Sequence, residues 1–123
     1  MVRMKLVYFF DTYAFFEIIA GNPAYEKFKD VQAITTIFNL AELNYGLKKE
    51  KGRAAADECT EKYMDFLVDV SLDDVKKAMD LKLQRKHLSI PDAVGYTIAK
   101  RYQATFLTGD GDFKDMPNVE LVR

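Results

Sequence analysis

The stretch LVYFFD at residues 6–11 carries the strongest indication of the fold. Five apolar residues run without interruption, and most of them are aromatic. A short continuous apolar run of this kind is typical of a strand that is buried on both faces, as in a parallel sheet. The acid that ends the run, Asp11, is therefore expected at the carboxyl end of the first strand.

The rest of the chain alternates predicted helices with short predicted strands. Ser71 with Asp74 forms a capping-box pattern that begins one helix, and Ser89 with Asp92 repeats that pattern at the next. Helices are predicted at Thr12–Ala20, Pro23–Lys29, Ile37–Glu50, Arg53–Asp65, Leu72–His87 and from Ser89 through Tyr102, and strands at Leu6–Phe10, Ala33–Thr36, Leu67–Val70, Thr105–Leu107 and Glu120–Val122. Because strands alternate with helices and no linker or repeat interrupts them, we expect a three-layer α/β/α domain with a mostly parallel central sheet, formed by residues 1–123.

The composition fits one compact domain and excludes several other classes of protein. The chain has 123 residues, of which 49% are apolar and 30% are charged, a balance that argues against disorder. A chain of this size buries roughly two thirds of its unfolded surface on folding, so its core needs no metal or disulfide to hold it. We therefore expect any bound metal to serve chemistry.

Charge and cysteine content limit the possible partners and compartments. Eighteen Lys and Arg stand against nineteen Asp and Glu, so a polyanion partner would need a local basic patch. The single Cys59 and the single His87 give poor support to zinc or thiol chemistry and are compatible with a reducing cytoplasm. No apolar run approaches the roughly 18 residues of a membrane span, so we expect a soluble protein.

Two acids follow predicted parallel strands directly. Asp11 comes after the strand at residues 6–10, and Asp110 comes in the turn after the strand at residues 105–107. In open α/β sheets, ligands bind outside the carboxyl ends of the strands, so both carboxylates are expected at the same edge. Each also has an ordinary interpretation, because Asp is common as a helix N-cap and in turns.

Glu42 and Asp92 are candidate acids on helices. Glu42 has no oppositely charged residue three or four positions away, and Gly46 one turn later suggests a close approach by substrate or by another segment. Asp92 is explained by its capping box alone, although that role is compatible with facing a cleft. The helix that carries Glu42 has a predicted apolar arc formed by Ile37, Leu40, Ala41, Tyr45 and Leu47.

Four carboxylates without a histidine or cysteine cluster favour a hard cation, Mg²⁺ or Mn²⁺. A divalent ion of this kind is suited to hydrolysis of a phosphodiester bond. Competing motifs are absent from the sequence: it has no nucleoside-triphosphate phosphate-binding loop, no dinucleotide fingerprint and no nucleophile elbow around Ser71 or Ser89.

The order and spacing of four segments resemble the PIN-domain ribonucleases, and within them the VapC toxins of prokaryotic toxin–antitoxin pairs. The segments that carry this resemblance are Val7–Thr12, Asn39–Gly46, Ile90–Ala93 with Ala99 downstream, and Phe106–Phe113. The resemblance covers nearly the whole chain. It implies an endoribonuclease in which Asp11, Glu42, Asp92 and Asp110 surround Mg²⁺ or Mn²⁺, Asp112 assists or replaces Asp110, and Thr12 and Thr108 support the carboxylates.

The same resemblance implies partners. Members of the family usually form homodimers, and the toxins are capped by a small antitoxin whose C-terminal segment blocks the acidic cleft. The best local patch for RNA is formed by Lys48, Lys49, Lys51 and Arg53, although such a run is also typical of a solvated helix end. The aromatic residues Tyr13, Phe15 and Phe16 are expected in the core, with an apolar surface for self-association as the alternative.

Two further functions compete with the ribonuclease hypothesis. A PIN-like fold could serve RNA processing, or could bind RNA or a protein without catalysis. A phosphoacceptor receiver domain also clusters aspartates at strand ends. It fits less well, because Asp11 is followed by Thr12 and Tyr13, and no lysine follows the late strand at Thr108 and Gly109.

Overall fold

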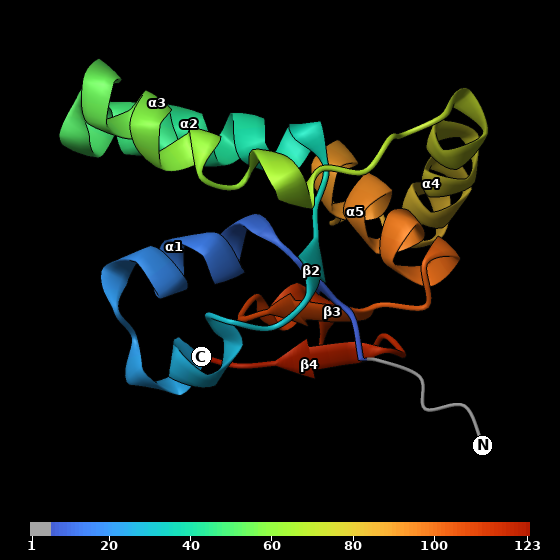
Figure 1. Ribbon diagram of the computed structural model, residues 1–123. Helices are drawn as coiled ribbons and strands as arrows, with labels where there is room; N and C mark the ends of the chain where they lie inside the picture. Colours follow the sequence, from blue (N-terminus) through green and yellow to red (C-terminus); the bar gives the residue numbers. More distant parts are fainter. Residues whose placement is uncertain (1–5) are drawn as a thin grey trace.

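A four-stranded parallel sheet forms the centre of the computed structural model, which describes residues 6–123 (Figure 1). The strands lie in the order β2-β1-β3-β4, so β1 and β3 occupy the two central positions. Their bounds are β1 at Tyr8–Phe10, β2 at Ala33–Ile34, β3 at Thr105–Thr108 and β4 at Val119–Leu121. The predicted parallel sheet is confirmed.

Helices cover both faces of this sheet and complete the expected three layers (Figure 1). The α-helices are α1 at Thr12–Ala20, α2 at Ile37–Lys51, α3 at Arg53–Glu61, α4 at Leu72–Gln84 and α5 at Ile90–Arg101, and the 3-10 helices are η1 at Pro23–Phe28, η2 at Met64–Phe66 and η3 at Gly111–Phe113. No helix within residues 6–123 combines the length and apolar character needed to cross a membrane.

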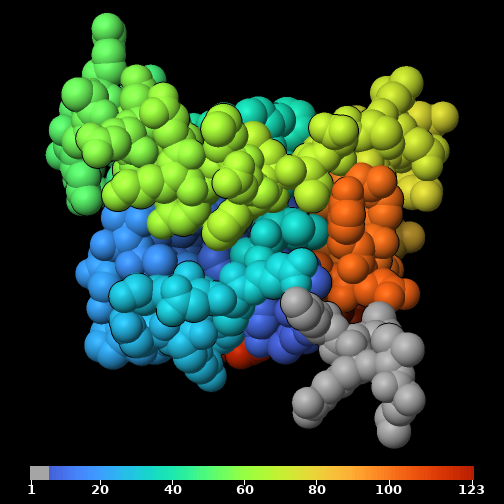
Figure 2. Space-filling model, in the orientation of Figure 1, coloured from blue at the N-terminus to red at the C-terminus, as the bar shows by residue number. Residues whose placement is uncertain are grey.

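Alternate residues of β1 enter two separate cores, as the pleat of a strand requires. Phe9 points toward α4 and α5 and stacks on Phe106 of β3, with 5.3 Å between the ring centroids. Tyr8 and Phe10 point to the opposite side and pack with residues of α1, α2 and α3. Figure 2 shows α3 and the residues after it lying over the α1 region on that side. The run LVYFFD is thus apolar because both of its faces are covered.

Several predicted boundaries were wrong. The first strand begins at Tyr8, because Leu6 lies beyond the paired region and is 60% exposed. The predicted strand at residues 67–70 is reduced to one bridge between Thr35 and Leu67, after which the chain turns into the cap of α4. The helix predicted to reach Asp65 ends at Glu61, and the aromatic residues after it fold back onto Phe15.

Smaller differences affect three other elements. The segment Pro23–Phe28 is a 3-10 helix, with its first turn set by the Asn22 cap and the proline. Helix α4 ends at Gln84, three residues earlier than predicted, where Arg85 leaves helical geometry. The last strand begins at Val119, one residue before the expected start.

Of the three aromatic residues at the start of α1, Phe15 is fully buried, and Tyr13 and Phe16 are partly buried against the same core. Phe16 also accounts for Gly46: a Cβ at that position would lie 2.5 Å from the Phe16 ring. The close approach predicted at Gly46 is therefore made by another segment of the chain.

Gly109, at the end of β3, permits an even tighter approach. A Cβ there would lie 2.6 Å from the backbone carbonyl oxygen of Val122 and closer still to the Tyr13 ring. We expect Gly109→Ala to lower the free energy of unfolding by about 2 kcal/mol, because the carbonyl cannot move without displacing the end of β4. Gly46→Ala is the control. Its neighbour is only the tip of a side chain, so its loss in chemical denaturation should be smaller, and an equal or larger loss would contradict this account.

Candidate active site

An open cleft of about 480 Å³ lies at the carboxyl edge of the sheet and gathers all four predicted acids. It is lined by Asp11, Thr12, Tyr13, Phe16, Glu42, Tyr45, Gly46, Lys49, Asp92 and Asp110. These residues come from the start and body of α1, from α2, from the first turn of α5 and from the turn after β3. The fold thus brings together four acids that are far apart in the sequence.

Asp11 is the most buried of these acids, with 4% of its surface exposed. It occupies the N-cap position of α1, but its side chain makes no capping hydrogen bond, so the cap interpretation does not account for it. The Thr108 hydroxyl donates to Asp11 Oδ2 at 2.7 Å. Burial raises the pKa of Asp11 to about 7, the negative charges of Asp92 and Glu42 add to that rise, and the Thr108 hydrogen bond opposes it.

Glu42 is exposed at the cleft and is held by a chain of polar side chains. The Thr12 hydroxyl donates to Glu42 Oε1 at 2.7 Å, and Asn39 Nδ2 donates to that hydroxyl at 3.1 Å. The Thr36 hydroxyl in turn donates to Asn39 Oδ1 at 2.7 Å. Asn39 is completely buried, which fixes the orientation of its amide. Sequence reasoning missed Asn39, and its only signal is a polar residue three positions after the Thr36 cap.

Asp92 combines the two roles that the sequence left open. Its carboxylate accepts the Ser89 backbone N–H at 3.1 Å, as a capping box requires, and it also lines the cleft. The pKa of Asp92 is raised, chiefly by burial and further by the nearby charges of Asp110 and Asp112, while the hydrogen bonds with Ser89 act against that rise.

The turn after β3 places Asp110 beside Thr108. The Thr108 hydroxyl accepts the Asp110 backbone N–H at 3.1 Å while it donates to Asp11, so one hydroxyl connects the two strand-end acids. Asp110 Oδ1 accepts the Asp112 backbone N–H at 2.9 Å, which closes the turn. Asp112 itself is exposed and lies outside the lining of the cleft.

The donors in the cleft fit a hard divalent cation by their chemistry. They are carboxylate and hydroxyl oxygens, and the pKa values of the buried Asp11 and the half-buried Asp92 are raised, chiefly by burial and further by the like charges nearby. In the part of the chain that the structure describes, no three histidine, cysteine, aspartate or glutamate side chains are grouped closely enough to hold an ion by themselves. Water commonly fills several positions around Mg²⁺ in such sites.

The predicted basic patch is divided by the structure. Lys49 lines the cleft, and its ammonium lies 4.4 Å from the centroid of the Tyr45 ring. Lys48 instead forms an ion pair with Asp57 of α3 at 3.3 Å, while Lys51 and Arg53 are exposed at the end of α2 and the start of α3. The predicted apolar arc of α2 was wrong at three positions: Ile37 is 57% and Tyr45 66% exposed, and Ala41 is exposed as well, because the buried side of α2 is formed by Asn39, Leu40, Leu43 and Leu47.

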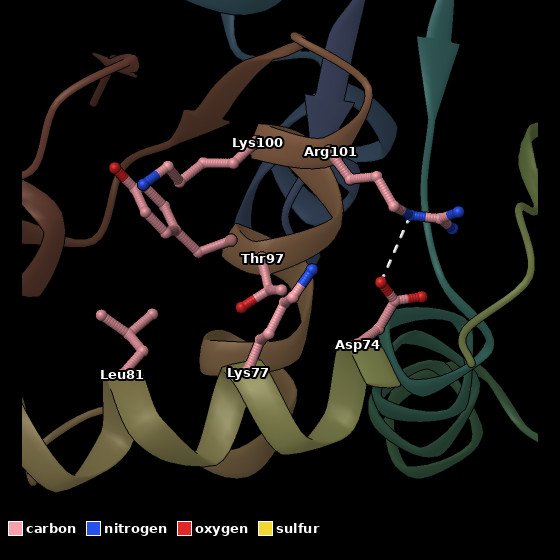
Figure 3. Close-up of a pocket in the computed structure, with 7 residues that line it drawn as sticks. Asp74, Lys77, Leu81, Thr97, Lys100 and Arg101 are labelled. Carbon is pink, nitrogen blue, oxygen red and sulfur yellow. Dashed lines mark ion pairs between the residues drawn. The ribbon is translucent and has the colours of Figure 1, made fainter. Parts of the chain in front are cut away.

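A second pocket, between α4 and α5, has a different character (Figure 3). Of the described residues that line it, the one acid is Asp74, which forms an ion pair with Arg101 at 3.3 Å and accepts the Ser71 backbone N–H at 2.9 Å. That backbone hydrogen bond is the largest influence lowering the pKa of Asp74, and the Arg101 charge contributes. A carboxylate already neutralised in this way makes the pocket a weaker candidate for metal chemistry than the acidic cleft.

The model of the PIN domain family matches residues 8–119, and the chain belongs to that family. The receiver-domain alternative is therefore wrong. A search of curated proteins found no match.

Solved structures share the fold at low sequence identity. Mycobacterium tuberculosis VapC20, described as a sarcin–ricin loop cleaving toxin, is 18% identical, with a TM-score of 0.78 over 95% of this chain and 99% of that one. A toxin–antitoxin complex from Klebsiella pneumoniae is 20% identical, with a TM-score of 0.76 over 92% and 95%. VapBC2 from Rickettsia felis, bound to a DNA fragment from its promoter, is 20% identical, with a TM-score of 0.73 over 96% and 100%.

The raised pKa of Asp11 predicts how stability depends on pH in the metal-free protein. The native state holds the Asp11 proton up to about pH 7, whereas an unfolded chain releases it near pH 3.8, so this group makes folding less favourable as pH rises between those values. We expect Asp11→Asn to raise the free energy of unfolding by about 2 kcal/mol or more at pH 8. That gain should shrink toward zero near pH 4. The measurement is chemical denaturation of both proteins with chelator across this range, and a gain that does not vary with pH would contradict the assignment.

Proposed function

We propose that this protein is a ribonuclease that depends on Mg²⁺ or Mn²⁺, hydrolyses RNA phosphodiester bonds and acts as the toxin of a VapBC-type pair. The observation that carries the proposal is the cleft itself, where Asp11, Glu42, Asp92 and Asp110 meet from four separate segments. Membership of the PIN domain family and the fold shared with VapC20 support a nuclease that cleaves RNA. The proposal includes a cytoplasmic location, to which the free Cys59 is suited.

The four acids, together with water molecules, would hold the divalent ion that nucleases of this family generally use, with Asp112 available from the adjoining turn. A bound cation supplies a Lewis acid for a phosphoryl oxygen and lowers the pKa of a water molecule. The protein's own part is to fix the carboxylates. Thr108 orients Asp11 through Oδ2, and Thr12 orients Glu42 through Oε1, which would leave Glu42 Oε2 free to take a proton from an attacking water.

The cleft also explains why a partner would inhibit the enzyme. The four acids lie in an open depression, so a peptide segment laid across it would exclude both RNA and water. The proposed partner is a small antitoxin, by analogy with the complexes from Klebsiella pneumoniae and Rickettsia felis, and the proposed assembly of the toxin is a homodimer.

Asp92→Asn should abolish RNA cleavage without unfolding the protein. Asparagine keeps an oxygen that can accept the Ser89 N–H but removes the negative charge from the cleft. Asp74→Asn is the matched control, because Asp74 holds the same capping-box position at α4 but lies in the other pocket. We expect the rate of cleavage of mixed structured and single-stranded RNAs to fall at least about 100-fold in Asp92→Asn. It should be unchanged in Asp74→Asn, with manganese or magnesium present and chelator as the blank.

Two results would overturn the proposal. One is cleavage by Asp92→Asn at the wild-type rate, which would mean that the Asp92 carboxylate takes no part in the cleavage observed. The other is the absence of products from folded wild-type protein with either metal, combined with RNA binding that chelator does not change. That result would favour the non-catalytic binding role.

A further inference from the structure

One side of α2 presents a row of different chemical groups to the cleft. Glu42, Tyr45, Gly46 and Lys49 lie at positions i, i+3, i+4 and i+7, which share a face of a helix, and all four line the cleft. The row therefore places a carboxylate, an aromatic ring and an ammonium in succession. At Gly46 the ring of Phe16 from α1 occupies the space that a side chain would take, so α1 and α2 together form this wall of the cleft.

Tyr45 has no packing role that explains it. It is 66% exposed, whereas the aromatic residues of the neighbouring cores are buried or half-buried. A large exposed ring at the wall of a polar cleft offers a flat apolar face together with a polar hydroxyl. Such faces bind nucleobases by stacking, and every base has a face that can stack in this way.

Among residues 6–123, Lys49 is the one basic residue in the lining of the cleft. Within residues 6–123 it forms no ion pair with a carboxylate, in contrast to Lys48, which is paired with Asp57. Its ammonium rests over the Tyr45 ring instead. The side chain is therefore free to contact an anion without breaking an existing salt bridge.

We propose that Tyr45 is a stacking platform for one unpaired nucleobase of the RNA and that Lys49 binds the phosphate next to that base. Along the helix axis, Tyr45 lies about 4.5 Å and Lys49 about 10 Å from Glu42, so the base and phosphate they hold adjoin the proposed site of cleavage. This inference rests on the proposed function for the identity of the nucleic acid, and it narrows the substrate to single-stranded or looped RNA. Bases inside a duplex have no free face to offer.

The arrangement of charge in the cleft supports a phosphate contact at Lys49. Asp11, Glu42, Asp92 and Asp110 repel a phosphodiester backbone, so an RNA strand needs a fixed contact beyond the acids to enter at all. Lys49 provides that contact at one end of the row. The base on Tyr45 then sets which nucleotide stands next to the acids.

Binding can be measured apart from cleavage, with chelator present and a short unpaired oligoribonucleotide that carries the fluorescent base 2-aminopurine. We expect Tyr45→Leu to weaken binding about tenfold and to remove the quenching that stacking produces, whereas Tyr45→Phe should keep both. Tyr102→Leu is the matched control, because Tyr102 is also exposed and lies beneath a cation, Arg101, but is outside the cleft. It should bind like the wild type.

The salt dependence of binding tests Lys49 separately. Loss of one phosphate contact should lower the slope of log binding constant against log salt by about 0.7, so Lys49→Met should be shallower than the wild type by that amount. Lys27→Met is the control, since Lys27 lies over the Phe28 ring in a comparable cation–π contact elsewhere on the molecule. Its slope should not change.

The proposal is overturned if Tyr45→Leu binds unpaired RNA as tightly as the wild type, or if the wild type binds duplex RNA equally well and without quenching. A protein partner is the alternative occupant of this wall, and the first of these results would favour it. Failure of the proposed function is a different outcome. Binding that depends on Tyr45 with no cleavage under any metal would leave the platform in place, whereas metal-dependent cleavage with KM unaffected in Tyr45→Leu would remove the platform alone.

Discussion

The structure depends on a carboxylate that is buried at the end of an apolar strand. β1 is a central strand with both faces covered, so the residue that follows it, Asp11, emerges between two hydrophobic cores. Burial of an ionised carboxylate is costly, and the Thr108 hydroxyl offers it only one hydrogen bond from a side chain. The raised pKa of Asp11 expresses that cost. A proton relieves it, and so would a cation, which makes the most buried acid of the cleft the one that gains most from an ion.

Neighbouring polar side chains hold the acids of the cleft in place by hydrogen bonds. Thr108 sits in β3, next to β1, and its hydroxyl serves Asp11 and the backbone of Asp110 at once. On the other side, Thr12 and Asn39 hold Glu42 through hydrogen bonds rather than through opposite charges. In the part of the chain that the structure describes, every buried side-chain polar atom has a hydrogen-bond partner. Within residues 6–123, the acids of the cleft are thus held in place by hydrogen bonds and not by ion pairs.

Most of the layer architecture could be predicted, because it depends on local patterns. The apolar run before Asp11, the two capping boxes and the alternation of strands with helices each need only neighbouring residues to be recognised. The exposed side of α2 could not be predicted in this way, because which side is buried depends on where α1 and α3 lie. Tyr45 was therefore predicted to lie in the core although it is 66% exposed, and the burial of Asn39 was not foreseen. The predicted strand at residues 67–70 was wrong for the same reason: a strand forms only where a partner strand continues beside it, and here the pairing ends at Leu67.

The two capping boxes make the limit of local reasoning clear. Ser71 with Asp74 and Ser89 with Asp92 have the same spacing, the same reciprocal hydrogen bonds and the same position at a helix start. Their carboxylates nevertheless respond in opposite directions: Ser71 and Arg101 lower the pKa of Asp74, whereas burial with Asp110 and Asp112 raises the pKa of Asp92. Nothing within the motif distinguishes them. At Asp74 the capping hydrogen bond outweighs burial, whereas at Asp92 burial outweighs the capping hydrogen bonds. The charges that the tertiary structure places nearby act in the same directions, a cation at Asp74 and further acids at Asp92, and a metal ion would relieve only the second arrangement.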